Sequence, residues 1–318
     1  GFSTVDGPLA DFRIRERNLL GKGQDLSFGT TIAGRRSEFD INFTEPYFLD
    51  RKLAAGVDLF HVTRDLQRES SYDQKRSGAG LRLGYDLSEN WRQSWRTTVE
   101  DNEIRNVQDD ASRFIKDQEG ARTTLALEHR ISYDTRDSKI NPREGVNAWL
   151  TTEVAGLADA QYFQNRLGAS WYHPLTENWI FSQLGEVGHI MGYGGKDVEI
   201  NERFFIGGTT MRGFEYGGIG PRDISTEDSL GGNTFYRGTS EVTFPISIDS
   251  DLPLKGHMFS DYGSLFSIDE PSDPSLADSS SLRVSLGVGV SWESPFGPLR
   301  LDVSKPIVKE DYDQSEPI

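Results

Sequence analysis

The chain has 318 residues, with 34 basic and 50 acidic side chains and a formal net charge of −16. This acidic excess argues against a nucleic-acid partner, because such proteins concentrate basic residues. Cysteine is absent, which excludes disulfides and thiolate metal sites. Hydrophobic residues make up 35%, and no stretch approaches the roughly 18 consecutive apolar residues of a membrane-crossing helix.

Alternation of apolar and polar residues is the dominant pattern along the chain, and it predicts β-strands rather than helices. The clearest case is 281–293, where apolar residues from Leu282 to Trp292 alternate with small or polar ones. Most expected strands are near the roughly 9–11 residues that cross a bilayer at a tilt. After a fragment at 1–5, we expect strands in chain order at 8–18, 24–34, 37–45, 52–64, 76–87, 91–103, 121–134, 145–155, 161–173, 178–192, 233–246, 254–266, 281–293 and 297–306.

The connections between these strands alternate in length. Longer polar connections lie at 65–75, 104–120, 193–232 and 267–280, whereas 35–36 and 156–160 are short members of the same side. The other side has turns with Gly, Pro, Asn or Asp at 19–23, 46–51, 88–90, 174–177 and 294–296, and a longer one at 135–144. Short turns at one rim and long loops at the other are typical of an outer-membrane barrel. The sequence therefore predicts an all-β fold, a transmembrane antiparallel β-barrel that forms one domain over 1–318.

Aromatic residues cluster near the expected strand ends and predict the interfacial girdles of a membrane barrel. The alternative is that they cover the ends of a soluble core, which the polar inner strand faces disfavour. These residues are Tyr47, Phe48, Trp91, Trp149, Trp171, Trp179 and Trp292. Acidic residues gather in the expected loops, at Gln108–Asp110, Asp223–Asp228 and Ile268–Asp278, where we expect a solvated acidic surface.

The segment Gly207–Phe214 reads Gly-Gly-Thr-Thr-Met-Arg-Gly-Phe and lies in the long connection 193–232. An arginine flanked by glycines on an irregular loop is poorly explained by packing. It is better explained by a loop that folds back and holds one charged contact, although a solvated loop arginine remains the alternative. The candidate residues are Gly207, Gly208, Met211, Arg212, Gly213 and Phe214.

Several segments, taken in order, resemble the barrel domain of the BamA-type outer-membrane assembly factors, in an alphaproteobacterial form. The resemblance covers essentially the whole chain. It is carried by Asn18–Gly23, Phe43–Phe48, Ser132–Ser138 with Pro142 and Gly145, Phe205–Phe214, Phe259–Leu265 and Gly287–Leu301.

The resemblance implies a barrel of sixteen strands in the outer membrane of a Gram-negative bacterium. Its first and last strands pair weakly at a seam through which barrel proteins are inserted. It also implies that the sixth external loop, here 193–232, tucks into the lumen through a Val-Arg-Gly-Phe-type motif. Met211 replaces the usual Val, and Asp261 matches the aspartate that holds the arginine, so an Arg212–Asp261 contact is expected.

Against the family plan, strand 8–18 is the second and strand 297–306 is the fifteenth. We therefore expect the first strand to be truncated and the last to be absent from the sequence given, as are the periplasmic repeat domains of the family. The seam residues are expected to be Gly1, Phe2, Ser3, Thr4 and Val5. The implied partners are unfolded outer-membrane protein clients, accessory subunits of an assembly complex and outer-membrane lipid.

Four functions are weighed. An insertase is favoured by the runs Thr44–Asp50 and Trp292–Pro298. A polypeptide-secretion channel of the same superfamily, of the two-partner secretion or TamA-like type, shares the loop motif and stays open. An enzyme is disfavoured, because none of the 5 histidines lies in a hydrolase or zinc-protease motif, and no phosphate-binding loop is present. We expect no catalytic residue, cofactor or metal. A passive porin is disfavoured because 193–232 should plug the lumen.

Overall fold

The computed structural model describes residues 1–3, 5–246, 254–269, 273–294 and 297–316. Each of the fourteen expected strands is present, with ends shifted by a few residues. The strands of the main sheet are β1 (Phe2–Ser3), β2 (Gly7–Leu19), β3 (Gln24–Ala33), β4 (Arg36–Glu45), β5 (Ala54–Leu66), β6 (Tyr72–Asp86), β7 (Trp91–Arg105), β8 (Gly120–Asp134), β9 (Gly145–Ala155), β10 (Tyr162–Pro174), β11 (Ile180–Gly192), β14 (Thr234–Pro245), β15 (Leu254–Phe266), β17 (Arg283–Ser294) and β18 (Gly297–Val308). Within the described part of the chain, no helix combines the length and apolar composition needed to cross a bilayer.

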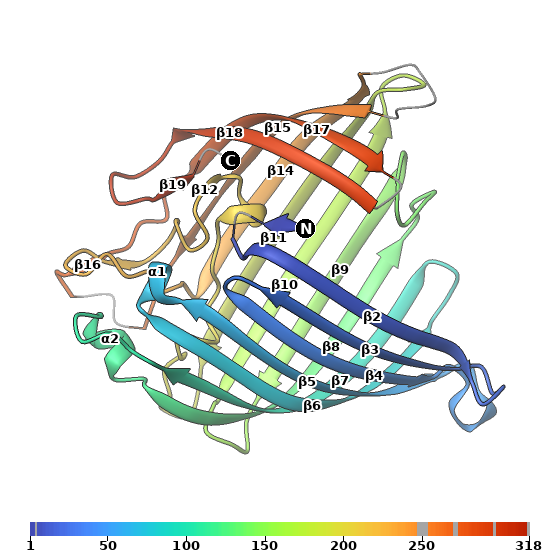
Figure 1. The fold of residues 1–318 in the computed structure, drawn as a ribbon, viewed down its shortest axis with the longest axis horizontal. Coiled ribbons are helices and arrows are strands. Elements are labelled where there is room, and N and C mark those ends of the chain that lie inside the picture. The colour runs from blue at the N-terminus through green and yellow to red at the C-terminus, as the bar shows by residue number, and fades with distance from the viewer. Residues whose placement is uncertain (4, 247–253, 270–272, 295–296, 317–318) are drawn as a thin grey trace.

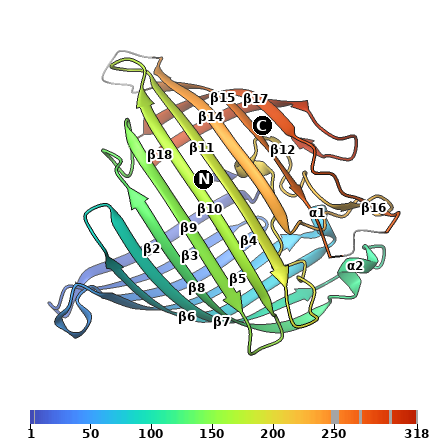
Figure 2. The ribbon, with the colours of Figure 1, turned by 180° about the vertical axis from the view of Figure 1, so that it is seen from behind.

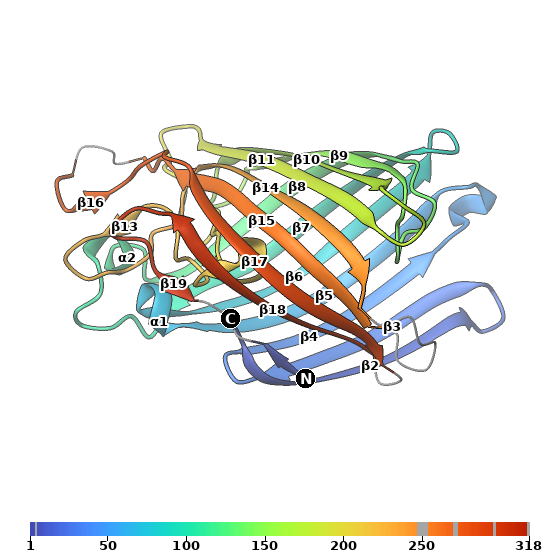
Figure 3. The same cartoon turned by 90° about the horizontal axis from the view of Figure 1, so that it is seen from above.

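The sheet is antiparallel, and its strands are arranged in the order in which they occur along the chain. The strands are tilted and curl into a barrel, whose continuous wall from β8 to β14 is seen from behind in Figure 2. Viewed from above, the wall encloses an interior that holds the gold loop elements (Figure 3). This confirms the predicted barrel fold.

The two ends of the sheet are β1–β2 and β18. Strand β1 has only 2 residues, and it pairs Phe2 with Pro8 and Ser3 with Gly7. Within the described residues no strand pairing joins β18 to β1 or β2. Thr4 lies outside the described residues, as do residues 247–253 and 295–296. Within the described residues, the sheet therefore stays open between its β1–β2 end and β18, where the seam is expected (Figure 1).

Period-two alternation divides the strands into an apolar outer face and a polar inner face. Ile14, Leu81, Val288 and Leu301 are all more than half exposed on the outside. This pattern suits an outer face in lipid and a wet lumen. Trp149 is an exception to the predicted girdles. Its ring stacks with two inward arginines of β8 and β10, so it faces the lumen.

Short elements that the sequence did not predict lie in the connections between strands and in the segment after β18. They are α1 (Gln67–Ser70), α2 (Arg113–Lys116), the 3-10 turns η1 (Phe48–Asp50) and η2 (Gly208–Thr210), β12 (Gly213–Phe214), β13 (Arg222–Asp223), β16 (Leu276–Ala277) and β19 (Ser315–Glu316). Strand β12 pairs with β19, and β13 pairs with β16. These pairings join connections that are far apart in the sequence.

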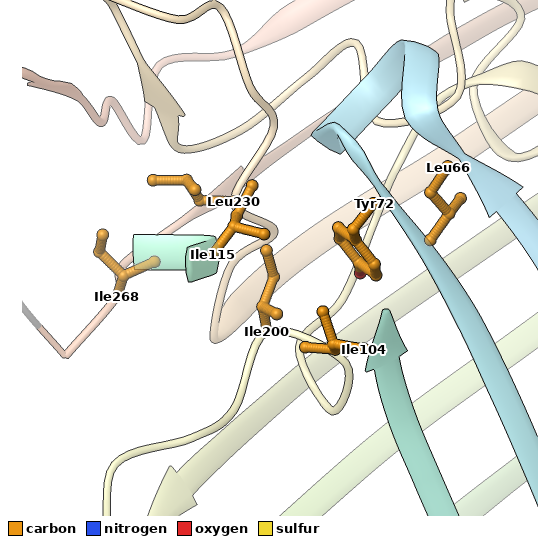
Figure 4. Close-up of a cluster of buried hydrophobic side chains, with 7 residues drawn as sticks. All are labelled: Leu66, Tyr72, Ile104, Ile115, Ile200, Leu230 and Ile268. Carbon is orange, nitrogen blue, oxygen red and sulfur yellow. The ribbon is translucent and has the colours of Figure 1, made fainter. Parts of the chain in front are cut away.

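The loops at the long-loop rim share a small hydrophobic core of their own (Figure 4). It is formed by seven buried side chains from three strand ends and three connections. These are Leu66, Tyr72, Ile104, Ile115, Ile200, Leu230 and Ile268. Because Ile200 and Leu230 belong to the 193–233 loop, this core ties that loop to its neighbours at the rim.

Candidate functional site: an arginine of the long loop inside the barrel

The connection between β11 and β14 is the longest in the chain and carries η2, β12 and β13. In Figure 1 its gold turn η2 and strand β12 lie inside the barrel wall, near the N-terminus. Arg237 on β14 donates a hydrogen bond to the carbonyl of Thr210 at 3.0 Å. The segment that contains Arg212 is therefore held against the inner wall by its own backbone as well as by side chains.

Arg212 faces the inner surface of β15. Its Nε donates to Asp261 Oδ2 at 2.7 Å, and its Nη2 donates to Asp261 Oδ1 at 2.8 Å. The Arg212 backbone N–H also donates to Asp261 Oδ2 at 3.0 Å. The sequence-derived pair is thus brought together in a bidentate arrangement, which is among the stronger forms of a charged hydrogen bond.

Two more carboxylates and one ring complete the surroundings of Arg212. Its Nη1 donates to Asp302 at 2.9 Å and to Glu241 at 3.3 Å, and its guanidinium carbon lies 3.3 Å from the centre of the Phe259 ring. Burial alone would lower the pKa of Arg212, but hydrogen bonds and charges from Asp261 and Asp302 outweigh burial and raise it. The side chain is therefore a permanent cation in a largely anionic socket.

Sequence reasoning missed the other members of this socket. Glu241 lies on β14, Phe259 on β15 and Asp302 on β18. They reach Arg212 only because β14 and β15 are adjacent in the sheet and β17 alone separates β15 from β18. Arg300 also binds both Glu241 and Asp302, at 2.7 Å and 2.9 Å. The sequence did indicate that these residues lie on the inner faces of their strands. It gave no indication that they contact Arg212.

The apolar neighbours of Arg212 in the loop are fully buried. Met211 and Phe214 are each 1% exposed and pack in one cluster with Ile206, Ile219 and Leu265, among others. Met211, which replaces the valine of the family motif, therefore fills a hydrophobic site next to the charged one.

Two glycines of the motif have backbone conformations that other residues adopt at a cost. Gly207 has φ +133, and a Cβ built on it would lie 1.7 Å from the carbonyl oxygen of Glu215. Gly213 has φ +94 and lies close to Ser285 of β17, with 3.1 Å between the built Cβ and the serine Cβ. The sequence pattern thus reflects a tight chain reversal at Gly207 and a close approach to the wall at Gly213.

A second ionisable residue of the loop, Glu202, contacts the barrel wall at β8. Glu202 accepts a hydrogen bond from the Thr124 hydroxyl at 3.3 Å, near the carboxylates of Glu100 and Glu153. Burial, followed by the charge of Glu100, raises the pKa of Glu202 to about 7. Sequence reasoning did not single out this residue.

Two acidic loop residues contradict the expected solvated surface. Asp223 and Asp228 are each 3% exposed. Asp223 accepts from the Ser112 hydroxyl at 2.7 Å, and Asp228 accepts from the Ser112 backbone N–H at 2.7 Å. They are buried because they satisfy backbone and hydroxyl donors between loops, an arrangement that composition alone cannot indicate.

The expected seam residues lie close to the motif. The Gly1 amino group and the backbone of Leu9 exchange hydrogen bonds at 2.9 Å, and a Cβ built on Gly208 would lie 2.9 Å from a methyl group of Val5. Ser3 lines the same cavity of about 720 Å³ as Arg212. The loop motif and the start of the sheet are therefore neighbours.

Comparison with known proteins identifies relatives across the whole barrel. BamA, the outer membrane protein assembly factor of Neorickettsia risticii, is 30% identical over 311 residues, which cover 97% of this chain and 42% of that protein. BamA of Neisseria meningitidis is 24% identical, with 99% of this chain and 44% of that protein covered. The sorting and assembly machinery component 50 homolog of Mus musculus is 25% identical over 86% of this chain and 60% of that protein. The chain thus spans about two fifths of the length of the two BamA proteins.

Solved structures show the same fold. BamA from Haemophilus ducreyi, in a crystal structure that lacks POTRA domains 1-3, superposes with a TM-score of 0.88 at 24% identity and covers 99% of this chain and 67% of that one. CdiB from Escherichia coli gives a TM-score of 0.66 at 14% identity, over 100% of this chain and 59% of that one. The Omp85 superfamily domain profile matches residues 18–318. The curled antiparallel wall, the inward loop and this match together show that the chain belongs to the Omp85 superfamily.

Proposed function

We propose that this chain is the membrane barrel of an outer-membrane protein insertase in a Gram-negative bacterium. The whole protein would fold and insert β-barrel clients with the help of accessory subunits and the surrounding lipid. The observation that carries this proposal is the identity with BamA proteins across nearly the entire barrel. CdiB from Escherichia coli shares the fold at only 14% identity, so the sequence similarity to the BamA proteins, and not the fold, supports the insertase.

The physical mechanism would be strand templating at the seam between the β1–β2 end of the sheet and β18. A sheet edge presents unpaired N–H and C=O groups, which lipid cannot satisfy. A client strand that pairs with this edge would satisfy them by β-augmentation. No covalent chemistry is required, so the barrel would act as a template and not as an enzyme.

We further propose that residues 1–318 form one barrel domain whose loop 193–232 plugs the lumen, and that Arg212 with Asp261 keeps the loop seated. The bidentate hydrogen bonds and the buried Met211 and Phe214 support this role. With the lumen filled, a client would have to use the seam.

Site-specific cross-linking would test the route. In the full-length protein, Ser3→Cys would place a thiol at the seam, and Ser170→Cys would place one on β10. Both serines line the cavity that Arg212 also lines. We expect a client with a cysteine in its terminal strand to cross-link to the Ser3→Cys protein and not to the Ser170→Cys protein. Equal or stronger cross-linking at position 170 would support passage through the lumen and contradict the insertase route.

Depletion in cells separates the two candidate functions. Loss of an insertase should lower many outer-membrane proteins at once, whereas loss of a secretion channel should block one exported polypeptide. Normal levels of outer-membrane proteins after depletion would contradict the proposal.

A further inference from the structure

Arginines gather at the short-turn end of the lumen. A cavity of about 450 Å³ lies there, next to Gly23 and Pro46 of two short turns. It is lined by five arginines and a single carboxylate: Arg13, Arg15, Arg17, Arg82, Arg96 and Asp25. We call these five arginines and their cavity the arginine pocket. This composition runs against the chain as a whole, whose net charge is −16.

The arginines of the pocket outnumber the carboxylates that bind them. Arg15 forms a fork with Asp25, in which Nε donates to Oδ1 at 3.0 Å and Nη2 donates to Oδ2 at 2.5 Å. Arg82 and Arg96 share Asp58, at 2.7 Å and 3.1 Å.

The other two arginines are held more loosely. Arg13 lies 3.5 Å from Asp40. Within the described residues, no ion pair within 4.0 Å is found for Arg17. Because each guanidinium carries five N–H donors, many donors of the pocket stay available. The side chains of Arg13 and Arg15 are at least half exposed, so these donors face open space.

The wall beyond the pocket has the opposite charge. A second cavity, of about 490 Å³, continues along the same strands toward the long loops. Its lining contains seven carboxylates and three arginines. The acidic members are Glu38, Asp40, Asp58, Glu100, Glu128, Glu153 and Glu202. The inner wall from β2 to β10 is therefore polarised, basic at the short-turn rim and acidic deeper in the lumen.

We propose that the arginine pocket binds carboxylate groups of extended polypeptide clients at the short-turn mouth of the barrel. This proposal deepens the insertase function and rests on it. Arginine forks match carboxylates in two parallel hydrogen bonds, as the Arg15–Asp25 pair already shows. The acidic zone beyond would repel the same client segment, so acidic segments are held at the mouth and not drawn deeper.

The position of the pocket favours a polypeptide over a lipid headgroup. Arg13, Arg15 and Arg17 alternate with Phe12 and Ile14, which are 56% and 58% exposed on the outer face. Lipid acyl chains would meet that outer face, whereas the arginines line a cavity at the short-turn mouth of the lumen. An inorganic or lipid phosphate has a similar oxyanion chemistry, and the experiment below separates the two sources.

Peptide binding to the intact full-length protein in detergent tests the pocket. The probe is a fluorescein-labelled extended octapeptide with four glutamates, compared with the same peptide carrying four glutamines, by fluorescence anisotropy. We expect the glutamate peptide to bind more tightly, and added salt to weaken its binding because the pocket is open to solvent. Equal binding of both peptides would overturn the proposal.

Matched variants locate the binding. Arg17→Gln removes a pocket arginine without breaking an ion pair, and Arg143→Gln removes an exposed arginine from the 135–144 turn at the same rim. We expect Arg17→Gln to weaken binding of the glutamate peptide about fivefold, the size of one good exposed ion pair, and Arg143→Gln to leave it unchanged. Equal effects of both variants would overturn the assignment to the pocket.

A competition measurement and an insertion measurement distinguish the possible outcomes. Glycerol phosphate and the unlabelled glutamate peptide are compared as competitors of the labelled glutamate peptide. If glycerol phosphate displaces the labelled peptide at concentrations at which the unlabelled peptide does not, the pocket is a phosphate site and the polypeptide assignment is wrong. Client insertion into liposomes is measured in parallel with the same proteins. If the protein inserts clients but binds both peptides equally, only the arginine pocket is refuted. If it prefers the glutamate peptide but inserts no client, the insertase function is refuted.

Discussion

Replacing Arg212 by alanine tests whether this arginine holds the long loop in the lumen. The Arg212 side chain is 17% exposed and that of Asp261 only 3%. Removing one partner of a buried ion pair costs about 3–5 kcal/mol, because the other charge stays buried without compensation. Asp261 keeps its hydrogen bond from the Thr239 hydroxyl at 2.8 Å, and Arg300 still neutralises Glu241. The cost should therefore fall near the lower limit.

About 3 kcal/mol corresponds to a rise of roughly 100-fold in the ratio of unseated to seated loop. Limited trypsin digestion of the folded protein in detergent measures this ratio, because cleavage within 193–232 follows the population of the open loop when reclosure is fast. Arg113→Ala is the matched control. It removes a loop arginine whose side chain is 62% exposed in its pair with Asp273, and an exposed pair contributes about 1 kcal/mol at most.

Two more variants refine the interpretation. Arg212→Lys keeps the charge but loses the fork, so its cleavage rate should lie between those of the wild type and Arg212→Ala. Exchanging the charges, with Arg212→Asp and Asp261→Arg in one chain, should restore part of the protection. The reasoning fails if Arg212→Ala is cleaved within the loop no faster than Arg113→Ala.

Three further predictions use the same digestion or a melting curve. The pKa of Glu202 is raised by burial from its ordinary value of 4.5 to about 7, so the seated loop binds a proton that the open loop has lost. Seating should therefore weaken as the pH rises from 4.5 to 7, by about 3 kcal/mol at most, and a Glu202→Gln protein that keeps this pH dependence would contradict the idea. Gly207→Ala should speed loop cleavage, because the added Cβ would lie 1.7 Å from a carbonyl oxygen of the loop. Gly195→Ala is the control, because Gly195 also has a positive φ but its added Cβ would meet open space. Equal cleavage rates of the two variants would count against a steric role of Gly207. Asp313→Asn should lower the melting temperature, because it removes the carboxylate 2.9 Å from Arg283 in a fully buried pair worth about 3 kcal/mol, and an unchanged melting temperature would show that Arg283 is satisfied by its other acceptors.

The period-two pattern predicted the strands because it is a local property. Each apolar residue of 281–293 signals its own face without reference to the rest of the chain. The alternation of turns and loops then predicted the antiparallel order. The Arg212–Asp261 pair was reached only through the family resemblance, since the two residues are far apart in the sequence and nothing local connects them.

Wherever the expectations failed, the deciding contacts come from distant segments. Trp149 lies near a strand end, as girdle residues do, but its register places it between inward arginines. Asp223 and Asp228 belong to an acidic run, yet contacts with another loop bury them. In each case the residue type was compatible with two environments, and packing chose between them.

The sequence by itself determined which residues form strands, which face of each strand is apolar, and that one arginine among glycines lies on the longest loop. Those properties depend on residues within a few positions of each other. Only the tertiary structure decided that Glu241, Asp302 and Phe259 surround Arg212, and that Arg82 and Arg96 join the arginines of β2. Such contacts depend on the register between strands and on the curvature of the wall, which are set by the whole sheet at once.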